Sequence, residues 1–101
     1  MIATFVTFDL GDSFDAEVVK KNALMARSKF ENMPGLRSKA FTFDTDKRQA
    51  INFYIWEEET VARNFFTEEN IAAVGKFYGV RPSIEYVEVT TLVDNHSVNN
   101  N

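Results

Sequence analysis

The stretch AINFYIW, residues 50–56, is the most aromatic segment of the chain, and its side chains alternate in character. In an extended strand, successive side chains point to opposite faces. Two rows result: Ile51, Phe53 and Ile55 on one face, and Asn52, Tyr54 and Trp56 on the other. Both rows are bulky, which a strand with one face in water does not need. The segment therefore predicts a strand that is covered on both faces.

The neighbouring segments predict three further strands, because they alternate and are rich in β-branched and aromatic residues. They are residues 2–10, 36–43 and 83–93. In residues 36–43 the alternation places Leu36 and Ser38 on one face and Lys39 on the other. The polar loop of residues 44–49 is short, so the strands that flank it are expected to pair as a hairpin.

The first helix is marked by apolar residues that recur every three or four positions from Ala16 to Met33. Asp12 or Ser13 is expected to cap its start, because short oxygen-bearing side chains accept hydrogen bonds from the free backbone N–H groups of the first turn. Pro34-Gly35 ends the helix, since proline cannot continue it and glycine tolerates the left-handed turn.

A second helical stretch runs from Glu59 to Gly79, and its period is interrupted near Thr67. The order of elements is therefore β-α-β-β-α-β. Right-handed connections place both helices on one face of a four-stranded antiparallel sheet. The predicted fold class is α+β and ferredoxin-like.

The predicted sheet has helices for one face only, yet its strands carry apolar side chains on both faces. The chain also has ten Phe among 101 residues, a heavy aromatic load for one small subunit to bury. Back-to-back pairing of two subunits through their open sheet faces would cover this surface. The sequence therefore predicts a homodimer.

The composition limits the partners and the location of the protein. A length of 101 residues fits one domain, residues 1–95, followed by a polar tail, residues 96–101. A net charge of −4 disfavours nucleic acids and anionic membranes, which bind positive faces. No apolar run reaches the ~20 residues of a membrane span, and residues 1–10 lack the basic start of a signal peptide. A cytoplasmic protein is expected.

These elements, in this order, resemble the dimeric α+β-barrel superfamily, and within it the YdhR-like monooxygenases and the related antibiotic-biosynthesis monooxygenases. The resemblance covers residues 1–95. The motifs that carry it are Met33-Pro34-Gly35-Leu36 with Ser38-Lys39, Tyr54-Ile55-Trp56-Glu57, Phe65-Phe66, and Tyr86 with Leu92-Val93-Asp94-Asn95. It implies a cofactor-independent monooxygenase, or a related isomerase, that acts on a small aromatic or polyketide-like compound between sheet and helices.

The row Asn52, Tyr54 and Trp56 is the candidate catalytic group. A buried amide, phenol and indole each need a hydrogen-bond partner, which a substrate carbonyl or hydroxyl would supply. The alternative is that the three side chains bond to nearby backbone or water and only pack. Trp56 also matches the strand-three tryptophan of similar oxygenases.

Oxygenation without a cofactor requires an electron-rich substrate, such as a phenolate or enolate, that is bound, deprotonated and shielded from water. Asn52 and Trp56 would orient the ring of such a substrate, and Tyr54, Tyr86 or Arg37 would stabilise the developing anion. The side chains expected to bind the substrate are Arg37, Phe65, Phe66, Tyr78 and Tyr86.

Other kinds of site are disfavoured. His96, the only histidine, lies in the polar tail and is interpreted as a solvated residue. Haem-degrading relatives use a histidine on the second helix, where this chain has AAVG at residues 72–75, so haem is not expected. Cysteine is absent, which excludes cysteine-based metal sites, and we expect neither a metal nor a cofactor.

The acidic run of residues 57–59 is interpreted as a solvated helix start and not as a cation site. An RNA-recognition motif has the same element order, but its basic and glycine signature is replaced here by Gln49-Ala50-Ile51-Asn52. The main alternative to an enzyme is a non-catalytic dimer that binds a small molecule or fills its pocket with its own side chains.

Overall fold

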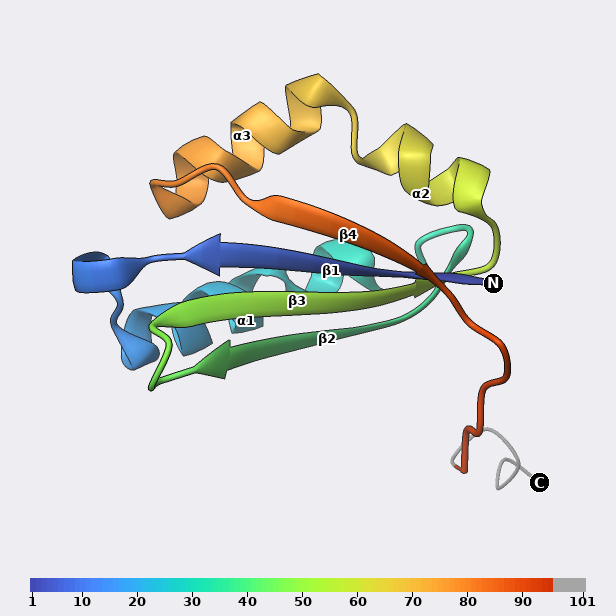
Figure 1. The fold of residues 1–101 in the computed structure, drawn as a ribbon, viewed down its shortest axis with the longest axis horizontal. Coiled ribbons are helices and arrows are strands. Elements are labelled where there is room, and N and C mark those ends of the chain that lie inside the picture. Colours follow the sequence, from blue (N-terminus) through green and yellow to red (C-terminus); the bar gives the residue numbers. More distant parts are fainter. Residues whose placement is uncertain (96–101) are drawn as a thin grey trace.

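The computed structural model describes residues 1–95, which form one four-stranded antiparallel sheet and its helices (Figure 1). The elements in chain order are β1 (Ile2–Asp9), the short 3-10 helix η1 (Gly11–Ser13), α1 (Ala16–Phe30), β2 (Leu36–Asp44), β3 (Gln49–Trp56), α2 (Glu59–Phe65), α3 (Glu68–Tyr78) and β4 (Ser83–Glu88). The strand order in the sheet is β2-β3-β1-β4. This confirms the predicted ferredoxin-like α+β architecture, including the β2–β3 hairpin.

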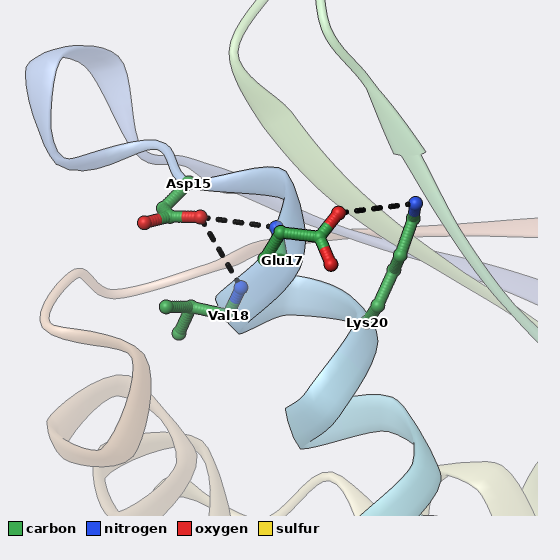
Figure 2. Close-up of polar contacts among 4 residues, drawn as sticks. All are labelled: Asp15, Glu17, Val18 and Lys20. Atoms are coloured by element: carbon green, nitrogen blue, oxygen red, sulfur yellow. Dashed lines mark hydrogen bonds and ion pairs between the residues drawn. The ribbon is translucent and has the colours of Figure 1, made fainter.

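Two helix boundaries follow from local capping. α1 begins after Asp15, whose carboxylate accepts hydrogen bonds from the backbone N–H groups of Glu17 at 3.0 Å and Val18 at 3.3 Å (Figure 2). The expected cap at Asp12 or Ser13 is wrong, because these residues form the separate turn η1. The predicted interruption near Thr67 is confirmed, since the Thr67 hydroxyl caps α3 by accepting from the Asn70 backbone N–H at 3.1 Å.

Two strands differ from their predicted form. β2 has a register shift between Leu36 and Ser38, so Leu36 pairs with Trp56 whereas Ser38 pairs with Ile55. A bulge of this kind moves one residue to the other face, and Leu36 packs against the core instead of sharing a face with Ser38. β4 ends at Glu88, five residues before the predicted end at Val93.

The hydrophobic core lies between the sheet and the helices. Phe8, Trp56 and Thr4 are its largest fully buried side chains. The second sheet face bears an aromatic pair, Phe5 and Phe53, which are Cα partners with ring centroids 4.9 Å apart. On this face Val87 is 44% exposed, so the described residues leave apolar surface uncovered.

The tail of residues 96–101, with His96, lies outside the described residues. No helix within residues 1–95 is long and apolar enough to cross a membrane.

Gly35 joins the loop after α1 to the start of α2. Its φ of +82° is favourable for glycine, and its carbonyl accepts a hydrogen bond from the Glu57 backbone N–H at 2.9 Å. A Cβ at this position would lie 2.6 Å from Cγ1 of Val61 on α2. The absence of a side chain thus allows α2 to approach this loop closely.

Gly35→Ala is expected to destabilise the protein more than Gly79→Ala. Gly79 has a similar φ of +85°, but nothing lies within 4 Å of the position that a methyl group would take there, so both variants share the backbone strain and only one adds a clash. We expect a loss of about 1–2 kcal/mol for Gly79→Ala and about 1–3 kcal/mol more for Gly35→Ala. Urea unfolding measures both values, and equal losses would contradict the proposed close contact.

Candidate functional site

A cavity of about 300 Å³ lies between the helix-covered face of the sheet and the helices. This volume is at the lower end of the range for small-molecule sites. All four strands contribute side chains to its wall, as do α1, α2 and α3. The wall is mainly apolar and aromatic, with Val6, Phe8, Phe30, Phe41, Phe65, Phe66, Ile71, Val74, Phe77, Tyr78 and Ile84 among its residues.

The strand register places the polar groups of the cavity. Thr4, Tyr54 and Lys39 are Cα partners across β1, β3 and β2, and Val6, Asn52 and Phe41 form the next row. Directly paired residues project to the same face of a sheet. Asn52 and Tyr54 therefore reach the cavity together with Lys39 and Phe41 from β2.

Lys39 and Tyr54 form a polar pair in this apolar setting. The Lys39 ammonium donates a hydrogen bond to the Tyr54 hydroxyl at 2.8 Å. Nζ of Lys39 also lies 3.3 Å from the ring centroid of Phe30 and 4.2 Å from that of Phe41. Aromatic faces attract a cation, so these rings and the Tyr54 ring surround the ammonium.

Burial changes the acid–base properties of the pair. Loss of hydration, and then repulsion by the nearby Lys29 charge, lower the pKa of Lys39 to about 7. The aromatic faces around it act against this shift, because they favour the charged form. Burial raises the pKa of Tyr54 well above its usual value. Tyr54 is therefore a neutral phenol at physiological pH, a hydrogen-bond donor and not a base.

Asn52 and Tyr78 form the second polar group of the wall. Burial raises the pKa of Tyr78, and a hydrogen bond with the Asn52 side chain acts in the opposite direction. Both residues line the cavity, and the Tyr78 ring stacks on Phe8 with centroids 4.0 Å apart. This contact holds the Tyr78 phenol beside Asn52.

Trp56 does not line the cavity. Its side chain is fully buried, and its indole N–H donates to the Thr4 hydroxyl at 3.0 Å. The indole is parallel to the Tyr54 ring, with centroids 5.3 Å apart and an angle of 11°. The row Asn52, Tyr54 and Trp56 was expected either to contact a substrate or only to pack. The structure favours packing for Trp56, whereas Asn52 and Tyr54 line the cavity.

Of the five predicted substrate-binding residues, three line the cavity and two do not. The three are Phe65, Phe66 and Tyr78. Arg37 is an exposed residue of β2, and its guanidinium lies 3.9 Å from the Glu57 carboxylate. Tyr86 is half-buried under Arg63, whose Cζ lies 3.8 Å above its ring. Neither Arg37 nor Tyr86 belongs to the cavity wall.

The sequence did not predict three residues of the cavity wall: Lys39 of β2, and Lys29 and Phe30 of α1. The alternation of β2 separated Lys39 from Ser38, but it did not show which face meets the helices. Within residues 1–95, no three His, Cys, Asp or Glu side chains come close enough together to hold a metal ion.

The chain matches no protein-family model and no curated protein sequence, whereas several solved structures share its fold. A monooxygenase from Streptomyces coelicolor, the product of ActVA-Orf6 in complex with nanaomycin D, is 18% identical with a TM-score of 0.66, over 91% of this chain and 89% of that one. A protein assigned to the antibiotic-biosynthesis monooxygenases, from Deinococcus radiodurans, is 10% identical with a TM-score of 0.63, over 93% and 97%.

A third structure, NE2512 of unknown function from Nitrosomonas europaea, is 14% identical with a TM-score of 0.68, over 91% of each chain. This chain thus shares the ferredoxin-like α+β fold of these solved structures. Identities this low show a common fold, and one fold supports many activities.

The lowered pKa of Lys39 predicts a pH-dependent effect on stability. The amine gives up its proton near pH 7 in the folded protein and near 10.5 when unfolded. Between these values the unfolded chain binds more protons, so this group makes folding more favourable as the pH rises. Lys39→Met removes the titrating amine. The free energy of unfolding of Lys39→Met relative to the wild type is therefore expected to decrease from pH ~7 to ~10.

Urea unfolding at several pH values across this range measures the difference. Lys47→Met, an exposed lysine in the loop between β2 and β3, serves as the control for losing one positive charge. A difference between Lys39→Met and the wild type that stays constant with pH would contradict the prediction.

Proposed function

We propose that this protein is a cofactor-independent monooxygenase that oxidises a small, electron-rich aromatic compound bound in the cavity. The observation that carries the proposal is the cavity itself, an aromatic cavity that the buried side chains of Tyr54 and Asn52 and the half-buried Lys39 line at the sheet. The fold similarity to the ActVA-Orf6 monooxygenase supports the same class of activity.

The chamber supplies what such a reaction requires of a protein. A phenolate passes one electron to dioxygen, and the resulting radical pair combines at a ring carbon to form a hydroperoxide. Loss of water from this hydroperoxide leaves a quinone, so one oxygen atom enters the ring and the other leaves in water. The protein has to orient the ring and stabilise negative charge in a water-poor site.

The cavity residues divide these tasks. The rings of Phe30, Phe41 and Phe65 would bind the faces and edges of the substrate. Tyr54, held neutral by burial, would donate a hydrogen bond to the anionic oxygen. The Asn52 amide would position a second polar group of the substrate, since Asn52 is buried in the cavity wall.

Oxygen uptake with a panel of anthrones and naphthols tests the activity. We expect uptake by the wild type, one labelled oxygen atom in the quinone when ¹⁸O₂ is used, and rates reduced about 10- to 100-fold in Tyr54→Phe and Asn52→Ala. Tyr86→Phe, the same chemical change outside the cavity wall, is the control and should retain the wild-type rate.

Two outcomes would contradict the residue roles and the oxygenase activity, respectively. Equal rates in all variants would remove these residues from the mechanism. Ligand binding without any oxygen uptake would instead support the alternative, a non-catalytic small-molecule-binding protein.

A cytoplasmic location remains a prediction of the sequence.

We also propose that the chain is a homodimer through the open face of the sheet. Phe5 and Phe53 lie centrally on this face, on neighbouring strands, and Val87 adds exposed apolar surface on β4. The helices pack on the opposite face, so a second subunit is the natural cover for these side chains.

The dimer is expected to have twice the 11.6 kDa chain mass by light scattering. Phe53→Lys should shift the particle toward a monomer, because it places a charge in the proposed interface. Leu24→Lys makes the same kind of change on the outer surface of α1, where Leu24 is 74% exposed, and should leave the mass unchanged. A wild-type monomer at micromolar concentration would rule out the dimer.

A further inference from the structure

The charged side chains of the cavity wall are all of one sign. Two of its residues, Lys29 of α1 and Lys39 of β2, are basic, and the wall contains no Asp or Glu. The chain as a whole is acidic, with a net charge of −4. The cavity therefore brings two basic side chains together within an acidic chain.

Neither lysine has an acidic partner in the described part of the chain. The ion pairs among residues 1–95 use other basic residues, and all of them lie on exposed surface. The polar contact of Lys39 is the neutral Tyr54 hydroxyl. A buried charge without a counter-charge is unfavourable, and Lys39 responds with a pKa lowered to about 7.

The Lys39–Tyr54 pair has hydrogen-bonding capacity left for a ligand. An ammonium has three donors, and the bond to Tyr54 uses one of them. Because the Tyr54 oxygen accepts this bond, its own O–H is available to another acceptor. One anionic oxygen near both groups would receive charge-assisted hydrogen bonds. The surrounding rings of Phe30 and Phe41 fit an aromatic body attached to that oxygen.

We propose that the cavity selects an aromatic anion: a planar ring system with one carboxylate or ionised phenol oxygen placed against Lys39 and Tyr54, and with Lys29 as the more distant positive charge. This inference rests on the proposed function, in that the cavity is taken as the substrate site, and it specifies the charge of the substrate. The anion supplies the counter-charge that the chain lacks.

Binding of the anion would change the protonation state of Lys39. In the free protein at pH 8 the Lys39 amine is mostly neutral, since its pKa is about 7. A bound anion favours the ammonium, so Lys39 takes up a proton when the anion binds. The uptake should approach one proton per site at pH ~8.

Binding of 1-naphthoate and 1-naphthamide, measured by calorimetry at pH ~8, tests the proposal, because the two probes differ mainly in charge. We expect the wild type to bind the naphthoate at least about tenfold more tightly. Titrations in buffers of different ionisation enthalpy count the protons taken up. Lys39→Met should lose both the preference and the uptake and still bind the naphthamide.

Two further variants distinguish the effect of a positive charge at position 39 from the effect of proton uptake there, and from the loss of a lysine charge elsewhere on the protein. Lys39→Arg keeps a permanent charge, so it should retain a preference for the naphthoate without proton uptake. Lys47→Met, which removes an exposed lysine outside the cavity, should behave as the wild type. Circular dichroism confirms that each variant is folded.

Three results would overturn the proposal. The wild type could bind the naphthamide as tightly as the naphthoate, Lys39→Met could keep the wild-type selectivity, or the wild type could bind neither probe. None of these results would by itself contradict the oxygenase proposal. If only the charge preference were wrong, oxygen uptake with the anthrones and naphthols would persist. Selective binding of naphthoate, together with oxygen uptake at background level, would support the charge preference of the cavity and contradict the oxygenase proposal.

Discussion

The side-chain alternation of β3 is the constraint on which the rest of the structure depends. It directs Asn52, Tyr54 and Trp56 toward the helices and leaves Phe53 on the open face of the sheet. A shift of one residue would exchange the two rows. The cavity, the core and the proposed dimer interface are therefore set by a single strand.

The helix-facing row serves two purposes that depend on position along the strand. At its end, Trp56 is fully buried and hydrogen-bonded to Thr4, so it fixes the packing. Tyr54 stacks on this indole with one side and meets Lys39 with its hydroxyl. Rigid packing thus holds a polar group at the cavity, as expected of a pre-organised binding site.

The electrostatics of the cavity differ from those of the surface. Exposed acidic residues give the chain its net charge, and their ion pairs contribute little to stability because water screens them. Lys39 is removed from this environment and surrounded by rings. The same burial that makes its charge unfavourable makes the side chain responsive to a bound anion.

The sequence by itself determined the element order, the β2–β3 hairpin, the break at Thr67 and the two rows of β3, because these features depend on local periodicity and turn chemistry. Only the tertiary structure decided that Trp56 finds its partner in Thr4 and that Lys39 lies beside Tyr54. Both contacts depend on strand register. Thr4 and Trp56 are 52 positions apart in the sequence, and Lys39 and Tyr54 are 15 positions apart, so each pair meets only when the sheet is formed. The bulge at Leu36 adds a change of face that alternation cannot reveal.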